Sequence, residues 1–462
     1  MPKTLIAALL ATALAAPALA APPKVDPALH AEALGILKKS VSYRTVQGGD
    51  QFVPYAEYLK GVLTAAGYKP EEITIEPMAG TAFLIARYPG TDPKKKPIVI
   101  SGHMDVVEAD PKDWTRDPFT AVEENGYVFG RGSVDNKFDV SMMVATLAKL
   151  RKSGWKPGRD VVLALSGDEE TTMKTTAVLA QRLKGAEMVL NIDGGGGSLN
   201  EDGTPVSFGV QGAEKTYADF HLTVTDPGGH SSRPTPTNAI YRLAKAIDKL
   251  EAYQWPTMSN EISRGALAAA AKNTAGPVGQ ALAKFAADPT DKAAIATIRA
   301  DYTWSPALHT TCVATMLSGG HAPNALPQKA EATVNCRIFP GTSSASVEKT
   351  LAEVVADPTV KVTRLDDGSI DSPASPLRPD VMAAVTKAVH ARFPGLAIVP
   401  SQASGATDSM YFRAAGVPSY GVSGLFMKDS DEFSHGLNER APVSAIDGDL
   451  AHYDSILRDL AK

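Results

Sequence analysis

The chain has 462 residues, of which 44% are hydrophobic and 21% are charged, and its formal net charge is -5. This composition is ordinary for a soluble globular protein, and the length allows two or three domains around a substantial core. Lys and Arg are scattered along the chain, so we expect no nucleic-acid partner. The run Lys94-Lys95-Lys96 is interpreted as a solvated turn before a strand.

The N-terminus has the features of a signal peptide. Lys3 gives a positive start, an apolar run follows from Leu5 to Ala16, and Ala18-Leu19-Ala20 is a small-x-small cleavage site. We expect cleavage after Ala20 and a secreted protein, periplasmic if the source is a Gram-negative bacterium. An uncleaved anchor is the alternative, but the apolar run is short and Pro17 interrupts it. The later segments are too short or too polar to span, so we expect no stable membrane anchor.

The first part of the mature chain follows an α/β pattern. Two helices with a loop between them are predicted over 30–67. Short apolar runs without alternation are typical of strands that are covered on both faces, and they occur at 96–100, 160–165 and 188–192. Helical spacing over 141–153 separates two of these runs. Strands that alternate with helices indicate a sheet with parallel pairing.

After about residue 210 the pattern changes. The segments are an alternating strand at 217–225, an amphipathic helix at 238–250, Ala-rich helices over 264–300, and strands near 311–317 and 330–338. Signals of the α/β type then resume, with helices near 379–392 and 444–460 and a strand near 417–422.

The predicted fold class is therefore α/β, with a mixed, mainly parallel sheet and helices on both faces. A smaller α+β domain with an antiparallel sheet interrupts this catalytic domain. The predicted boundaries are 1–20 for the signal peptide, 21–212 and 342–462 for the catalytic domain, and 213–341 for the inserted domain.

Cys312 and Cys336 are the two cysteines of the chain. If the strands that carry them pair as an antiparallel hairpin, the thiols fall roughly opposite each other and within reach of a disulfide. A slip in register by one residue would turn the side chains to opposite faces and leave two free thiols. The sequence leaves both outcomes open.

Potential metal ligands follow the predicted strands. His103, the pair Glu169-Glu170 and Asp193 each come directly after one, and Asp135 lies in a Gly-rich loop just before a helix. A single polar residue at such a place is usually a cap or a satisfied polar group. Several such residues at one edge of a sheet indicate a binding site, because ligands bind there in open α/β folds.

Adding His435 gives two imidazoles and three carboxylates, a set that suits Zn²⁺ or a similar divalent ion, with Co²⁺ or Mn²⁺ as alternatives. Three carboxylates around one such ion leave a net charge of about -1, and around two ions about +1, which a bridging hydroxide would neutralise. The charge balance therefore favours two divalent metal ions.

These segments resemble the successive metal motifs of the M20 metallopeptidase family, whose members include glutamate carboxypeptidases, aminoacylases, carnosine-type dipeptidases and desuccinylases. The resemblance covers nearly all of the mature chain. It rests on Ser101-Gly102-His103-Met104-Asp105, Gly130-Arg131-Gly132-Ser133-Val134-Asp135, Gly167-Asp168-Glu169-Glu170, Asn191-Ile192-Asp193-Gly194-Gly195, Pro227-Gly228-Gly229-His230-Ser231-Ser232 and Phe433-Ser434-His435-Gly436.

The resemblance implies a role for each residue of the metal site. Asp135 would bridge two ions, with His103 and Asp193 completing one site and Glu170 and His435 the other. Glu169 would be the general base that takes a proton from metal-bound water and passes it to the leaving nitrogen. Asp105 would accept the free ring N–H of the first histidine and fix its tautomer; an ordinary capping role is the alternative.

The resemblance also implies that the inserted domain is a lid and a homodimerisation domain. His230 would stabilise the oxyanion, often in the partner's site. Asn324 and Arg337 match positions that contact substrate, although a loop Asn and a strand-end ion pair are the alternative. Gly405 lies in a segment that resembles a late substrate loop. Met410 stands where aminoacylase and carboxypeptidase-S relatives often carry a basic residue, which weakens assignment to those subgroups.

The expected function is hydrolysis of an amide bond, peptide or N-acyl, in a small substrate with a free carboxylate. A dipeptidase or aminopeptidase that recognises a substrate amine is the alternative within the family. A non-catalytic periplasmic binding protein on the same fold is the alternative outside enzymes. Glu169 argues against the binding protein, because a pure binder has no need of an unligated base beside the metals.

Overall fold

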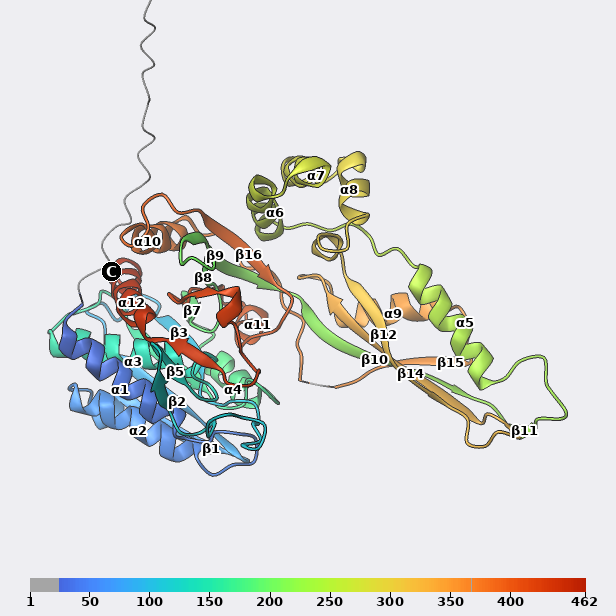
Figure 1. The fold of residues 1–462 in the computed structure, drawn as a ribbon, viewed down its shortest axis with the longest axis horizontal. Helices are drawn as coiled ribbons and strands as arrows, with labels where there is room; N and C mark the ends of the chain where they lie inside the picture. Colours follow the sequence, from blue (N-terminus) through green and yellow to red (C-terminus); the bar gives the residue numbers. More distant parts are fainter. Residues whose placement is uncertain (1–24, 367) are drawn as a thin grey trace, which may run out of the picture.

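The computed structural model describes residues 25–366 and 368–462, so the predicted signal peptide lies outside the described residues. A large α/β domain carries both ends of the described chain, and a smaller domain extends from one side of it (Figure 1). Within the described residues, no helix is both long and apolar enough to cross a membrane.

The large domain is built on a ten-stranded mixed sheet in the order β1-β2-β6-β3-β7-β17-β9-β8-β18, with β16 paired to β9. At its centre β6, β3, β7 and β17 are parallel neighbours. The strands are β1 (Ile73–Met78), β2 (Thr81–Tyr88), β3 (Ile98–His103), β6 (Val161–Ser166), β7 (Met188–Asn191), β8 (Gly196–Leu199), β9 (Pro205–Glu214), β16 (Ile398–Ala403), β17 (Ser419–Gly421) and β18 (Phe426–Lys428). A separate small sheet contains β4 (Val122–Glu124), β5 (Tyr127–Phe129) and β19 (Arg440–Pro442).

Helices cover both faces of this sheet, as predicted. One face packs against α1 (Pro27–Val41), α2 (Phe52–Ala65), α3 (Lys137–Lys152), α10 (Pro379–His390) and α12 (Ile446–Leu460). The other face packs against α4 (Lys174–Arg182) and α11 (Ser409–Ala414). In β3, Ile98 and Ile100 lie in the first core and Val99 in the second, which explains an apolar run without alternation.

The smaller domain has an antiparallel four-stranded sheet in the order β12-β14-β10-β15. Its strands are β10 (Thr216–Thr225), β12 (Thr311–Gly319), β14 (Lys329–Ile338) and β15 (Val360–Arg364). The helices α5 (Ala239–Ala252) and α9 (Ser344–Val355) cover one face and share its core. At the far tip β11 (Gly229–His230) pairs with β13 (Ala325–Leu326).

The second boundary of the inserted domain differs from the prediction. The sequence placed it at residue 341, but α9 and β15 lie beyond that point and pack with the same sheet. Strand β15 pairs with β10, which belongs to the inserted domain by any boundary. The chain therefore returns to the large domain after Arg364. The β15 segment is short and half-exposed, so its apolar pattern is weak.

Three helices form a cluster beside the junction of the two domains: α6 (Glu261–Asn273), α7 (Gly276–Ala287) and α8 (Lys292–Arg299) (Figure 1). They have their own small core, to which Leu267, Phe285 and Ile298 contribute. The antiparallel register of β12 and β14 places Cys312 directly opposite Cys336, and the two form a disulfide. Of the two outcomes that the sequence left open, the structure has the disulfide.

Candidate active site

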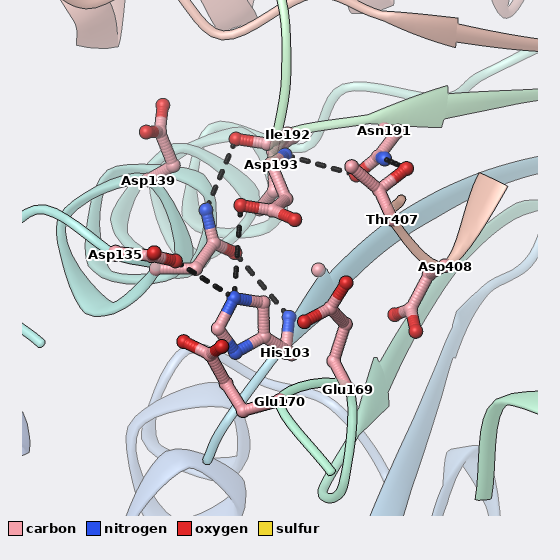
Figure 2. Close-up of polar contacts among 12 residues, drawn as sticks. His103, Asp135, Asp139, Glu169, Glu170, Asn191, Ile192, Asp193, Thr407 and Asp408 are labelled. Atoms are coloured by element: carbon pink, nitrogen blue, oxygen red, sulfur yellow. Dashed lines mark hydrogen bonds and ion pairs between the residues drawn. The ribbon is translucent and has the colours of Figure 1, made fainter. Parts of the chain in front are cut away.

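The topology of the sheet brings the predicted ligands together. His103 ends β3, Glu170 follows β6 and Asp193 follows β7, and these three strands are parallel neighbours. Their carboxyl ends therefore meet at one edge of the sheet. Asp135 reaches this edge from the loop before α3, and Figure 2 shows its carboxylate facing the ring of His103. His435 enters from the loop before β19.

The ligands fall into two groups that share Asp135. In the first, His103 Nε2 lies 3.0 Å from Asp135 Oδ1 and 3.6 Å from Asp193 Oδ1. In the second, His435 Nε2 lies 2.9 Å from Glu170 Oε1 and 3.2 Å from Asp135 Oδ2. Each carboxylate oxygen of Asp135 thus faces a different group.

The spacing of these atoms fits tetrahedral metal coordination. Two ligands about 2.1 Å from one tetrahedral Zn²⁺ lie about 3.4 Å from each other. The nitrogen–oxygen distances within both groups scatter around that value, between 2.9 and 3.6 Å. In each group, one potential ligand atom of every residue lies within 4.8 Å of those of the other residues. The residues therefore fit two divalent ions with one bridging carboxylate.

The pKa values of the ligand residues also indicate a site that attracts cations. Hydrogen bonds to Asp135 and Glu170 raise the pKa of His435 to about 10. Burial raises the pKa of Asp193 to about 6, against the opposing charge of His103. The carboxylates of Asp135 and Glu170 thus favour a positive charge at the imidazole of His435. A metal ion must displace the proton of that imidazole, so loading releases a proton and metal affinity rises with pH.

Glu169 lies beside the two groups that share Asp135, and it is close enough to His103 and Glu170 to form a third candidate group with them. Its side chain points into the space next to His103 and Asp193 (Figure 2). It is 9% exposed, and burial raises its pKa well above the usual range, with the charge of His103 acting in the opposite direction. A carboxyl group that holds its proton more tightly than usual, beside metal ligands, is suited to general acid–base chemistry.

Asp105 contacts His103, as predicted, and its carboxylate also binds the turn that carries Glu169 and Glu170. The ring Nδ1 of His103 lies 3.0 Å from the backbone carbonyl of Asp105 and 3.4 Å from its carboxylate. The carboxylate instead accepts hydrogen bonds from the backbone N–H groups of Glu169 and Glu170, at 3.1 and 2.9 Å. Asp105 therefore orients the first histidine mainly through its main chain. Its side chain holds the turn that carries the base and a ligand.

A buried ion pair, which sequence reasoning missed, positions two ligands. Arg131 Nη1 donates to Glu439 Oε2 at 2.7 Å, and both side chains are almost fully buried. Glu439 also accepts from the backbone N–H of Asp135 at 3.1 Å, and Arg131 donates to the carbonyl of His435 at 3.2 Å. The pair thus links the bridging ligand to the last histidine. In the sequence, Arg131 stands in the Gly-rich motif before Asp135 and Glu439 follows His435 by four residues, but neither position indicates that the two pair.

A second supporting network, also missed, lies behind Asp193. Its backbone N–H donates to Asn191 Oδ1 at 2.9 Å, and Asn191 Nδ2 donates to Thr407 Oγ1 at 3.0 Å. The neighbouring Asp408 accepts from the hydroxyl of Ser166 at 2.7 Å and lies near Glu169 in Figure 2. The segment predicted to contact substrate, Gly405 to Met410, therefore also supports a metal ligand. Met410 itself is buried.

The remaining predicted residues divide between two places. Arg337 Nη1 donates to the carbonyl of Ser404 at 2.8 Å, so Arg337 and Gly405 lie at the same corner of the junction between the domains. His230 and Asn324 lie together at the exposed far tip, where the N–H of Ser231 donates to the Asn324 carbonyl at 3.1 Å. That tip is well separated from the large domain in Figure 1. Within one chain the structure does not bring His230 and Asn324 to the metal ligands.

A large α/β domain with a dinuclear-type ligand set and an inserted antiparallel domain defines a class of metal-dependent hydrolase. The model of peptidase family M20/M25/M40 matches residues 99–459, and the chain belongs to this family. It is therefore an enzyme of the metallopeptidase and amidohydrolase class.

Two relatives match most of the chain at below 30% identity. The chain is 29% identical to the N-fatty-acyl-amino acid synthase/hydrolase PM20D1 of Bos taurus over 77% of this chain and 72% of the relative. It is 28% identical to the succinyl-diaminopimelate desuccinylase of Cereibacter sphaeroides, over 87% and 92%.

Solved structures confirm the fold. An M20 family metallo-carboxypeptidase from Sulfolobus solfataricus superposes with a TM-score of 0.68 at 19% identity, covering 93% of this chain and 99% of that chain. A dinuclear metal-binding M20 peptidase from Bacillus subtilis superposes with a TM-score of 0.60 at 13% identity, covering 94% and 99%.

Proposed function

We propose that this enzyme uses two divalent ions, Zn²⁺ in the first instance, to cleave the amide bond of a peptide or N-acyl amino acid that has a free carboxylate. The observation that carries this proposal is the position of the Asp135 carboxylate, whose two oxygens face separate ligand groups, with Glu169 beside them. The test is turnover of a panel of N-acyl amino acids, dipeptides and their C-terminal amides by the metal-loaded protein. Hydrolysis of the free acids alone is expected.

Two ions at this site would polarise the scissile carbonyl and lower the pKa of a water molecule. Glu169 then takes the proton of that water and delivers it to the leaving nitrogen, so one residue acts as base and then as acid. Asp105 keeps Glu169 in place through the backbone N–H of Glu169. A cavity of about 320 Å³ borders Asp135 and Asp193 and gives a small substrate room beside them.

Metal content tests the bridge. Asp135→Ala is expected to lower the metal content at both positions, because the missing carboxylate belongs to both ligand groups. Elemental analysis after dialysis measures the ions that remain, with close to two per parental chain. Glu170→Ala is the matched control, since Glu170 contributes to only one of the two groups that share Asp135 and its loss should spare one ion. One tightly held ion that is unchanged in Asp135→Ala would contradict the bridged model.

We propose that Arg337 binds the free carboxylate of the substrate. Its guanidinium is held by the carbonyl of Ser404 and lies 4.7 Å above the ring of Tyr217, which fixes its plane. A planar guanidinium can bind a carboxylate through two parallel hydrogen bonds. The relatives named as N-fatty-acyl-amino acid hydrolases and carboxypeptidases support a substrate with this group.

Arg337→Ala and amidation of the substrate carboxylate are each expected to lower kcat/KM by about 10–100-fold, because each removes a charge-assisted contact. The two changes together should cost little more than either one, since both remove the same contact. Steady-state kinetics of all four combinations measure this. If the fold-losses in kcat/KM of the two single changes multiply in the combination, Arg337 acts elsewhere. Faster turnover of the amides than of the free acids would favour the aminopeptidase alternative.

We further propose a homodimer in which His230 serves the partner's site. Strand β12 is the edge of its sheet, and Val313, Met316 and Leu317 on it are 62%, 68% and 71% exposed. A long exposed apolar edge strand invites pairing with a second copy. The nearby α5 adds exposed Ile240 and Tyr241, at 42% and 59%.

The hydrogen bonds of His230 leave its Nε2 as the nitrogen that can donate. The backbone N–H of Ser232 donates to His230 Nδ1 at 3.1 Å, so in the neutral imidazole the proton sits on Nε2. That nitrogen is then a donor on an exposed side chain. A donor of this kind is suited to stabilise the oxyanion of a tetrahedral intermediate.

We also propose export of the protein, on the basis of the positive, apolar and small-residue regions that precede Ala21. N-terminal sequencing of protein recovered from the cell envelope or medium is expected to begin at Ala21. A mature protein that begins at the initiating Met and stays in the cytosol would contradict this.

A further inference from the structure

A second cavity, of about 330 Å³, lies at the junction of the two domains between the helical cluster and the end of β16. Its size is within the range of pockets that bind small molecules, about 300–1,000 Å³. Apolar and aromatic residues form slightly more than half of its lining, one lining residue is charged, and the uncharged polar ones are Ser263, Thr303, Gln402 and Ser404. The main apolar lining residues are Ala266, Leu267, Trp304, Pro306, Ala307 and Ala403, and the charged residue is Lys215.

This cavity adjoins the place proposed for the substrate carboxylate. Ser404 belongs to the wall of the cavity, and its carbonyl accepts the 2.8 Å hydrogen bond from Arg337. In an amino acid the side chain and the carboxylate branch from the same carbon. A substrate whose carboxylate is held by Arg337 therefore carries its side chain to within a few bonds of this cavity.

Lys215 fixes one wall of the cavity to the junction. Its backbone N–H donates to the carbonyl of Ala403 at 3.0 Å, and its side-chain Nζ donates to the carbonyls of Pro306 and His309 at 2.7 and 2.8 Å. The residue is only 5% exposed. The turn that contains Trp304 and Pro306 is thus tied to the strand that leads into the inserted domain. A pocket whose walls are fixed in this way loses little entropy when it binds a ligand.

We infer that this cavity is the pocket for the side chain of the substrate residue that carries the free carboxylate, and that it selects large apolar and aromatic side chains. The inference rests on the proposed function and specifies its substrate class. Burial of such a side chain against the apolar wall lowers the free energy of binding, and the ring of Trp304 can stack with an aromatic side chain. Two N–H groups of the Lys215 ammonium are already committed to carbonyls, so the lysine acts mainly as part of the frame.

The test is a substitution that fills the cavity. Ala266 on α6 lines it, whereas Ala268 on the same helix is exposed and does not. Ala266→Phe is expected to lower the ratio of kcat/KM for N-acetylphenylalanine to that for N-acetylglycine by about 10–100-fold, because glycine needs no pocket. Ala268→Phe, the same change on the other side of the helix, should leave the ratio as in the parent. Melting temperature and metal content identify a variant that has failed to fold.

Trp304→Ala provides a second variant that removes wall instead of adding bulk, and it should lower the same ratio. If both variants fold and the ratio is unchanged in both, the inference is overturned. The proposed function would still stand, provided that the parent hydrolyses N-acetylglycine. A parent that prefers N-acetylglutamate over N-acetylphenylalanine would also overturn it and would make Lys215 a binding group. A parent that hydrolyses none of these compounds would instead refute the proposed function.

Discussion

Glu169→Gln is expected to lower kcat by about 10²–10⁴ while leaving the metal content unchanged. The amide has nearly the shape of the carboxyl group but cannot carry a proton from water to the leaving nitrogen. The ligand groups that share Asp135 do not include Glu169, so their geometry should survive. The backbone hydrogen bond from Glu169 to Asp105 does not depend on the side chain and should also persist.

The measurement combines steady-state kinetics with elemental analysis of the same preparation. Glu71→Gln is a matched control, because Glu71 is an exposed carboxylate in the large domain, remote in sequence from the ligands. Loss of metal together with activity would make Glu169 a structural ligand. A parental rate that Glu169→Gln leaves unchanged would mean that Glu169 is not the general base.

In the large domain, the strands that the sequence predicted are buried on both faces, whereas the predicted strands of the smaller domain are half-exposed or exposed. In β3, β6 and β7 every residue is buried, and each strand begins with an unbroken run of apolar side chains. Strands β9 and β16 were missed although they form the junction between the domains. Glycines interrupt β9, and β16 is half-exposed along its whole length and pairs with a strand nearly two hundred positions earlier. A single sequence carries no signal for such a distant pairing.

The residues of the site also divide into those that the sequence predicts and those that it does not. His103, Glu170 and Asp193 could be found because each directly follows a predicted strand, and parallel strands bring their ends together. Glu439 could not be found in this way, because it acts through backbone N–H groups of a loop 305 positions away. Almost every residue type has a backbone N–H, so the residues that donate to this carboxylate cannot be recognised by their side chains. Supporting residues of this kind become visible only in three dimensions.

Two inactive variants of this enzyme are expected to restore activity when their subunits are exchanged. His230→Ala should keep its metals and lose much of its kcat, because the proposed oxyanion donor is gone. Glu169→Gln should be nearly inactive, with the damage confined to the subunit that carries it. The exposed position of His230 at the far tip of the inserted domain is the reason to place its action in the partner.

In a mixed dimer, the His230→Ala subunit keeps its own Glu169 and receives the intact His230 of the Glu169→Gln subunit. Random reassembly makes about half of the dimers mixed, each with one complete site of two, so about a quarter of the parental activity should return. Each variant taken alone through dissociation and reassembly controls for recovery, and His321→Ala tests whether any exposed histidine near the tip matters. Exchange can be verified with subunits of different mass. If verified exchange restores nothing, His230 acts within its own chain or outside catalysis, and the edge strand β12 has another role.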